Sequence, residues 1–338
     1  MKAGKFVKVA IKITGSLVLT VLLFYLSEYL MRVLDPATKF PNGRVGNVIY
    51  TWGYPVSLNK FGFRERDFDV PKPAGIYRIM VLGDSFVFGT GLPVEERFTN
   101  VLEKKLNIAF PTRKFEVLSF GIEGLCTKSE RDILSKYAPV VKPDLVVVGY
   151  VSNDVQCESL SQQRIPFVDY WLMSSLSHAF TNTKLDYWAL LFRQSFLNLE
   201  TTLGREPSWT DLFSKAYNVQ SGSWADFLNT LGDIKKISDH LGLPTPILAV
   251  LDHSHYSNRR NDYTNPDEAI AVYLKAVRQA EAAAVGLGFT AYNYEKEIIS
   301  EFPDGRFALN QFDNHPPAKL HEIYAEKLLS ILTEKYLK

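Results

Sequence analysis

The chain has 338 residues, of which 46% are hydrophobic and 22% charged, and its formal net charge is +1. This length suits one large domain or two small ones with a buried core. A net charge so close to zero gives no global electrostatic argument for an acidic partner, and we expect no nucleic-acid partner. Cys126 and Cys157, the two cysteines, form no disulfide framework and no metal-binding spacing, so we expect neither a metal nor another cofactor.

The first 33 residues differ from this ordinary composition. Four lysines between Lys2 and Lys12 precede an uncharged run over 13–27, which with its polar flanks reaches about 20 residues, enough to span a bilayer. Because basic residues precede the run and few follow it, we predict a single-pass signal anchor with the N-terminus in the cytoplasm and residues 34–338 outside. A cleaved signal peptide is the alternative, although no A-x-A-like site follows the run. Four clustered lysines argue against a buried helix.

Beyond the anchor, apolar runs alternate with helical patterns. Residues 34–75 are rich in Pro, Gly, Asn and aromatic residues, and we expect an extended linker there. We predict strands at 77–82, 115–120, 144–150, 246–251 and 289–294, and helices at 95–106, 128–137, 267–285 and 318–336. Continuous apolar strands between helices predict an α/β fold over 76–338, a three-layer α/β/α sandwich with a five-stranded parallel, flavodoxin-like sheet. Such folds place their sites at the carboxyl ends of the strands.

A long segment separates the third predicted strand from the fourth. It spans about ninety residues, where a minimal fold needs a single crossover helix. Aromatic residues at helical spacing, such as Trp188 and Phe192, predict a helical insertion at about 158–235. An additional layer of core and a cap over the catalytic edge are both compatible with this pattern.

A serine follows the first predicted strand, in Gly83-Asp84-Ser85. At a turn from a strand into a helix, the Ser85 hydroxyl would be exposed, and its backbone N–H would point toward a developing oxyanion. Taken alone, however, Ser85 fits the N-cap of the following helix at least as well.

Three further candidates follow later elements. Gly124 comes after the second strand and Asn153 after the third, and a glycine N–H and an asparagine amide would serve as oxyanion donors. A glycine turn and an Asn-Asp helix start are the simpler alternatives. Asp313 and His315 place an acid and a base on the loop before the last helix, a segment that is also typical of a surface turn.

In this order, the blocks GDSFVFG, GIEG, VSND and DNHPP resemble the four blocks of the SGNH/GDSL hydrolase superfamily. The lead-in NKFGFRERDF and the stretches YRIMVLGDSFVFGTGL and KPDLVVVGYVSNDV are similar to its bacterial membrane-anchored branch. The resemblance implies Ser85 as nucleophile and His315 as general base. It also implies an oxyanion hole of the Ser85 N–H, the Gly124 N–H and the Asn153 side chain. The implied substrate is an acylated small molecule, lipid or polysaccharide.

Two positions depart from the superfamily pattern. The acid usually lies three residues before the histidine, where this chain has Phe312. We assign the orienting role to Asp313, two residues before His315, which can reach the imidazole if the loop turns tightly. Asp304 is a reserve candidate, and a dyad without an acid stays open. Val151 stands where many members have glycine.

Neighbouring residues receive lesser roles. We expect Asp84 and Asp154 to bond loop backbone. His253 and His255 follow the fourth strand, where substrate contact or, as the minor alternative, metal binding is conceivable. His321 resembles a position that is often histidine in the superfamily and is assigned a structural role. Whether the two cysteines pair in an oxidising compartment stays open, because neither their spacing nor their direction is known.

The leading hypothesis is therefore a serine esterase that forms an acyl-enzyme. An envelope O-acyltransferase would use the same residues and differ only in what excludes water. A non-catalytic binding protein with the same fold would be signalled by loss of the serine, asparagine or histidine, and all three are present. A flavodoxin-like nucleotide binder lacks support, since the turn after the first strand has neither P-loop nor GxGxxG spacing.

Overall fold

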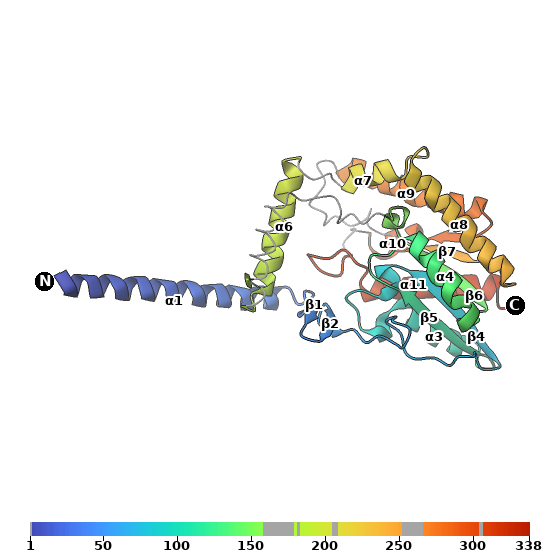
Figure 1. Cartoon of the computed structure of the whole chain (residues 1–338), viewed down its shortest axis with the longest axis horizontal. Coiled ribbons are helices and arrows are strands. Elements are labelled where there is room, and N and C mark those ends of the chain that lie inside the picture. The colour runs from blue at the N-terminus through green and yellow to red at the C-terminus, as the bar shows by residue number, and fades with distance from the viewer. Residues whose placement is uncertain (1, 158–178, 181–182, 205–208, 252–265, 304–306) are drawn as a thin grey trace. The chain divides into compact units, whose positions relative to one another are not determined.

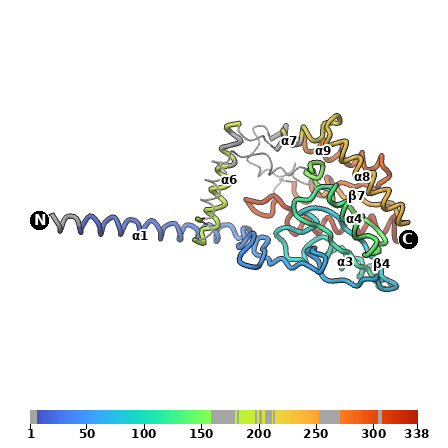
Figure 2. Tube along the Cα trace, viewed as in Figure 1, coloured from blue at the N-terminus to red at the C-terminus, as the bar shows by residue number. Residues whose placement is uncertain are grey.

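The computed structural model describes residues 2–157, 179–180, 183–204, 209–251, 266–303 and 307–338, and Figure 2 traces them. The chain divides into two compact units. Unit 1 comprises Met1–Pro41 and Arg164–Glu206, and unit 2 comprises Asn42–Gln163 and Pro207–Lys338. Unit 1 contains the helices α1 (Lys2–Leu34) and α6 (Asp186–Thr202), whereas unit 2 contains the strands.

The centre of unit 2 is a parallel sheet of five strands in the order β5-β4-β6-β7-β8. Its strands are β4 (Ile76–Gly83), β5 (Lys114–Gly121), β6 (Leu145–Tyr150), β7 (Ile247–Val250) and β8 (Thr290–Asn293). Every predicted strand is present, with ends that differ by at most one residue. The predicted fold class, an α/β fold with a five-stranded parallel sheet between helices, is confirmed.

Helices cover both faces of this sheet (Figure 1). One face carries α3 (Phe98–Ala109), α10 (Glu295–Glu301) and α11 (Ala318–Lys335). The other carries α4 (Thr127–Val141), α7 (Trp209–Ala216), α8 (Gly222–His240) and α9 (Pro266–Gly286). Along β4, Met80 and Leu82 pack toward the α4 face and Ile79 and Val81 toward the α3 face. This double burial explains why the strands are continuous apolar runs in the sequence.

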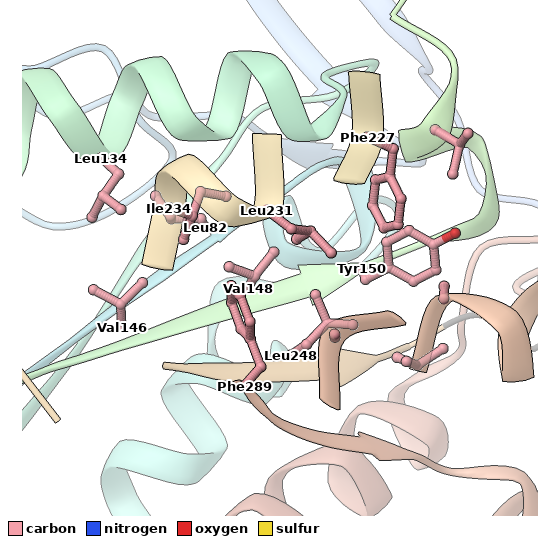
Figure 3. Packing of buried hydrophobic residues seen from close by; sticks show 14 of the residues in the cluster. Leu82, Leu134, Val146, Val148, Tyr150, Phe227, Leu231, Ile234, Leu248 and Phe289 are labelled. Carbon is pink, nitrogen blue, oxygen red and sulfur yellow. The ribbon is translucent and has the colours of Figure 1, made fainter. Parts of the chain in front are cut away.

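Figure 3 shows how the α8 face is filled. Leu231 and Ile234 of α8 lie over Val146 and Val148 of β6. Leu134 of α4 lies beside them, and all these side chains are fully buried. Burying each such side chain stabilises the folded chain by roughly 2 kcal/mol. This packing holds α8 against the sheet as the crossover helix between β6 and β7.

The helix predicted from Glu95 begins later than expected. A short 3₁₀ turn, η1 (Val94–Glu96), comes first, and α3 starts only at Phe98. Between them Arg97 has an extended backbone, with φ −66° and ψ 136°, and its side chain is buried. Apolar spacing alone would extend the helix through Arg97. The buried ion pair that Arg97 forms with Glu65 interrupts this helical pattern.

The range expected as an extended linker contains short elements. Strands β1 (Gly43–Val45), β2 (Val48–Thr51) and β3 (Tyr54–Pro55) form a small antiparallel sheet. After it, Phe63 and Phe68 are buried in the core of unit 2. From Asn42 onward this range is therefore part of the folded unit.

In unit 1, Val7–Leu34 of α1 is long and apolar enough to cross a membrane, the one such helix among the described residues. None of its most apolar window is buried within the structure. A membrane anchor and a signal sequence share these properties.

Candidate active site

Ser85 begins a one-turn helix directly after β4. In this helix, α2 (Ser85–Phe88), Asp84 is the N-cap, and its Oδ1 accepts the N–H of Phe86 at 3.0 Å. Gly89, with φ 77°, ends the turn in the left-handed conformation that glycine adopts without strain. Strand, cap and glycine together hold Ser85 at the carboxyl edge of the sheet.

Three glycines let this turn lie directly on the strand ends. Gly83 of β4 pairs with Gly121 of β5 on one side and Gly149 of β6 on the other. A Cβ on Gly121 would lie 2.3 Å from the backbone nitrogen of Phe88. A Cβ on Gly83 or Gly149 would lie 2.2 or 2.5 Å from Val87 Cγ2. Larger residues at these positions would lift the serine turn away from the neighbouring loops.

The Ser85 hydroxyl is hydrogen-bonded to its neighbour. It donates to Asp84 Oδ2 at 3.2 Å, and the Asn153 amide donates to the same oxygen at 3.3 Å. Asp84 thus brings Ser85 and Asn153 together, which goes beyond the backbone role expected for it. Burial raises the pKa of Asp84, although the Phe86 N–H, the charge of His315 and these hydrogen bonds oppose the rise.

Several N–H donors stand at the same sheet edge. Asn153 lies in the 3₁₀ turn η2 (Ser152–Val155) after β6, and Gly124 lies in the loop after β5. Gly124 has φ 76°, and among the described residues no atom other than those of its chain neighbours lies within 4 Å of the place where its Cβ would be. Among the described residues, neither the Ser85 N–H nor the Gly124 N–H has an acceptor. These donors are therefore available to an incoming group.

A tight loop presents His315. Asn310 and Asp313 exchange backbone hydrogen bonds at 3.2 and 3.3 Å, which brings the chain back on itself. Asp313 Oδ1 then accepts both the backbone N–H of His315, at 2.9 Å, and a hydrogen bond from His315 Nδ1. The second carboxylate oxygen accepts the indole N–H of Trp52 at 2.6 Å. The acid two residues before the histidine therefore does reach the ring.

The two side chains shift each other's titration. Burial alone would raise the pKa of Asp313, but the charge of His315 and the hydrogen bonds from His315 and Trp52 lower it to about 2. Burial alone would lower the pKa of His315, but the charge and hydrogen bond of Asp313 raise it, with smaller contributions from Asp84 and Glu123. With Nδ1 bound to Asp313, Nε2 is the nitrogen left to act as a base.

His315 lies beside the serine turn. Its ring centroid is 5.5 Å from that of Phe86, the residue after Ser85. In the described part of the chain no hydrogen bond joins Ser85 to His315, since the serine hydroxyl turns toward Asp84. A Ser85–His315 hydrogen bond would therefore require a change of the Ser85 rotamer, and such contacts are often loose without substrate.

A disulfide connects the two loops that carry the oxyanion candidates. Cys126, two residues after Gly124, pairs with Cys157, four residues after Asn153, and their Cα atoms are 5.2 Å apart. The pairing that the sequence left open is therefore formed. It restrains the loops after β5 and β6 relative to each other.

Comparisons with known proteins yield structural matches only. No protein-family model matches the chain, and no curated protein matches it in sequence. A lipase/acylhydrolase from Enterococcus faecalis is 13% identical, with a TM-score of 0.44 over 77% of this chain and 96% of that chain. TesA is 13% identical, with a TM-score of 0.41 over 76% and 98%. A two-domain esterase active on acetylated mannans is 14% identical, with a TM-score of 0.43 over 77% and 49%. The roles assigned at the site depend on the contacts above.

A buried arginine with no role predicted from the sequence binds the backbone at the end of the serine turn. Arg64 is 2% exposed and donates to the carbonyl oxygens of Phe88, Gly89 and Leu92 at 3.2, 2.7 and 2.7 Å. Burial, and then the charge of Arg97, lower its pKa to about 10. The motif NKFGFRERDF contains this arginine, but nothing in its spacing points to these carbonyls.

A second buried arginine ties the same segment to the sheet. Arg97 pairs with Glu65 at 2.7 Å and donates to the carbonyl oxygen of Arg64. The same Glu65 oxygen accepts the N–H of Ser119 in β5 at 3.0 Å. These charges satisfy one another inside the protein, as buried ions require.

The remaining candidates have other surroundings. His321 is fully buried, and its Nδ1 accepts the N–H of Phe98 at 3.1 Å, so it connects α11 to the start of α3. Asp154 Oδ2 accepts the N–H of Val151 at 2.7 Å, a bond to loop backbone.

Three other candidates, His253, His255 and Asp304, lie outside the described residues. Within the described ranges no group of three or more His, Cys, Asp or Glu side chains is arranged to hold a metal ion.

Proposed function

We propose that the chain is a serine esterase of the SGNH/GDSL type, with Ser85 as nucleophile, His315 as base and Asp313 as the residue that orients the base. One observation carries the proposal. Asp313 binds His315 through Nδ1 on a loop beside the serine turn, which leaves Nε2 free next to a serine with unoccupied N–H donors around it. An acid hydrogen-bonded to the base, with the base beside a serine, is the arrangement that acyl transfer needs.

Catalysis begins when the Ser85 hydroxyl turns from Asp84 to His315. As Oγ attacks the acyl carbonyl carbon, its proton passes to Nε2, and the carboxylate of Asp313 stabilises the imidazolium that results. The carbonyl oxygen becomes an oxyanion. The N–H groups of Ser85 and Gly124 and the amide of Asn153 are the donors for its charge.

The tetrahedral intermediate then collapses. The bond from the carbonyl carbon to the alcohol oxygen breaks, and the leaving alcohol takes the proton from His315 Nε2. The acyl group is now bound to Ser85 Oγ. Water attacks this acyl-enzyme, gives its proton to Nε2, and the second collapse releases a carboxylic acid and restores the serine hydroxyl.

We also propose that α1 is a retained membrane anchor and that unit 2 lies outside the cytoplasm. The disulfide between Cys126 and Cys157 supports the location, because such bonds persist in oxidising compartments. Retention is supported by Glu28 near the end of α1, whose carboxylate accepts N–H groups of α6. A helix that caps another helix belongs to the folded chain.

The test is covalent labelling of the full-length protein with a fluorophosphonate, followed by hydrolysis of p-nitrophenyl acetate. We expect the label on Ser85 and its loss, with all turnover, in Ser85→Ala, while the exposed control Ser57→Ala keeps both. His315→Ala should lower kcat by at least about 10³-fold with the thermal unfolding curve unchanged. Labelled and active Ser85→Ala protein would refute the proposal.

A further inference from the structure

The outer end of α1 holds the first turn of α6. Both oxygens of the Glu28 carboxylate accept the Tyr187 N–H, at 2.9 and 3.1 Å, and one also accepts the Trp188 N–H at 3.2 Å. Glu28 is only 4% exposed. The N–H groups at the start of a helix lack partners within it, so Glu28 caps α6 from another helix.

Charges around this cap are paired. Arg32 donates to Glu28 at 2.8 Å and to Asp186, the first residue of α6, at 2.8 Å. One arginine therefore bridges the two carboxylates where α1 and α6 meet. A paired cluster of this kind suits the headgroup level of a membrane.

Two neighbouring side chains of α6 contact opposite ends of the last turns of α1. Trp188 reaches back toward the apolar run, since its indole N–H donates to Ser27 at 3.1 Å and its ring meets Phe24 edge-on at 5.3 Å. Tyr187 reaches the other way, and its hydroxyl donates to Asp35, beyond the end of α1, at 3.3 Å. The face that carries Trp188 therefore looks toward the apolar run, and the face that carries Tyr187 looks away from it.

The Trp188 face of α6 is apolar along its whole length. A stripe at helical spacing runs through Trp188, Phe192, Phe196 and Leu199 and continues to Leu203, directly after the end of α6. The first three are half-buried, whereas Leu199 and Leu203 are 52% and 53% exposed. Figure 1 shows α6 running across the axis of α1 instead of along it. With α1 along the membrane normal, α6 would lie in the plane of the surface.

We propose that α6 is an interfacial helix, whose apolar stripe enters the boundary between headgroups and acyl chains on the side of the bilayer where α1 ends. The proposal rests on the membrane span proposed above for α1. From Lys12 to Arg32 an α-helix rises about 30 Å, the thickness of the hydrocarbon core. The Trp188 indole donates to Ser27, which lies about 8 Å before Arg32, within the roughly 5–10 Å that an interfacial helix enters the boundary.

Lipid is favoured over protein as the occupant because the stripe continues an apolar surface. The exposed face of α1 and the stripe of α6 meet at the Phe24–Trp188 contact, on the same side of the Glu28 cap. An amphipathic helix held in this way lies about 5–10 Å deep in the interface. The α1–α6 pair thus anchors the protein by a span and by a surface helix.

A single-cysteine probe tests the proposal in the full-length chain. The two native cysteines are bonded to each other, so Leu199→Cys provides one thiol for an environment-sensitive fluorophore. Arg193→Cys, exposed and off the stripe, is the matched control. Both proteins are reconstituted in vesicles of phosphatidylcholine and phosphatidylglycerol in equal parts. Quenching by brominated acyl chains is compared with quenching by iodide, and carbonate extraction separately reports the span of α1.

We expect brominated lipid to quench the Leu199 probe roughly twofold or more above the Arg193 probe, and iodide to show the reverse order. Glu28→Ala should lower the lipid quenching at Leu199 while the protein stays resistant to carbonate. A Leu199 probe open to iodide would overturn the proposal, and so would one shielded from both quenchers, which would mean that a second copy or another part of the chain covers the stripe. Loss of carbonate resistance would overturn the span and this proposal together. None of these readouts depends on esterase activity.

Discussion

The Asp313→Asn substitution is the most demanding test of the candidate site. The Asp313 carboxylate accepts three hydrogen bonds: from the ring and the backbone of His315 and from the indole of Trp52. Asparagine keeps the size of the side chain and removes its charge. Both carboxylate oxygens of Asp313 now accept hydrogen bonds, whereas asparagine replaces one of these oxygens by an NH₂ group, which donates. The imidazole must therefore change its orientation or its tautomer.

The pKa of Asp313 gives the magnitude. Its fall from 3.8 to about 2 means that the surroundings favour the carboxylate by roughly 2.5 kcal/mol, much of it through His315. If the imidazolium of the transition state loses this stabilisation, kcat falls about 100-fold. A misplaced tautomer adds to the loss, so we expect a decrease in kcat between about 10² and 10⁴.

The assay is the pH profile of kcat/KM for p-nitrophenyl acetate. His315 acts as a base only when neutral, and Asp313 raises its pKa from the ordinary 6.5. Activity in the wild-type protein should therefore rise with pH through a midpoint above that value. In Asp313→Asn the midpoint should move to lower pH, because the charge that stabilised the imidazolium is gone.

Two variants sharpen the comparison. Trp52→Phe removes one donor to Asp313 and leaves the His315 contact, so its kcat should fall no more than about 10-fold and its pH midpoint should change little. Asp304→Asn should have wild-type activity. The reasoning would be refuted if Asp313→Asn kept kcat within about threefold and kept its midpoint, or if Asp304→Asn showed the large loss instead.

Three further outcomes concern stability. Glu130 is fully buried without a hydrogen-bond partner for either carboxyl oxygen among the described residues, and burial, then the charge of Asp84, raise its pKa well above 4.5. The stabilising contribution of the protonated Glu130 carboxyl is complete below pH 4.5 and is lost as pH rises through the raised pKa. Glu130→Gln should therefore raise the Tm at neutral pH and not near pH 4. An equal gain at both pH values would contradict this. Reducing the Cys126–Cys157 disulfide, which closes a loop with a sequence separation of 31, should lower the free energy of unfolding by about 3–4 kcal/mol. Urea titrations with and without reductant measure this loss, and identical curves would count against it. Arg64→Met should cost about 2–4 kcal/mol in the same titration by leaving three carbonyls without their donor, and a loss under about 0.5 kcal/mol would show that they find other partners.

The sheet was predictable because its strands carry their signal locally. Each is an unbroken apolar run, and in a chain with helices between the runs this pattern is typical of parallel strands buried on both faces. The placement rule for open α/β sheets then indicated which turns to inspect. Ser85, Gly124 and Asn153 follow β4, β5 and β6 in the structure as the sequence led us to expect.

Other parts of the site have no local signal. Trp52 donates to Asp313 across 261 residues of chain, and its turn lies in a range without periodicity that we expected to be a linker. Arg64 and Arg97 likewise act through carbonyl oxygens and a carboxylate that the fold brings to them. Such contacts depend on the packed tertiary structure, and a motif in one segment does not specify its partner.

The spacing of Asp313 shows where motif and geometry separate. The superfamily pattern places the acid three residues before the histidine, and in this chain that position is Phe312. The backbone exchange between Asn310 and Asp313 shortens the loop, so that an acid two residues before His315 reaches Nδ1. The physical requirement is a carboxylate at the imidazole and not a number of residues. A departure in spacing is therefore tolerated when the turn changes with it.

The Ser85 hydroxyl donates its hydrogen bond to Asp84 and not to His315, and the proposed mechanism must account for this. The same Asp84 oxygen accepts the Asn153 amide, so one buried carboxylate restrains both the proposed nucleophile and a proposed oxyanion donor. A substrate carbonyl that draws the Asn153 amide toward its oxygen would weaken that amide's bond to Asp84. Rotation of Ser85 toward His315 would meanwhile release its own bond to the same carboxylate. Asp84 would then keep its bond to the Phe86 N–H, which holds the serine turn in place while both proposed catalytic groups move.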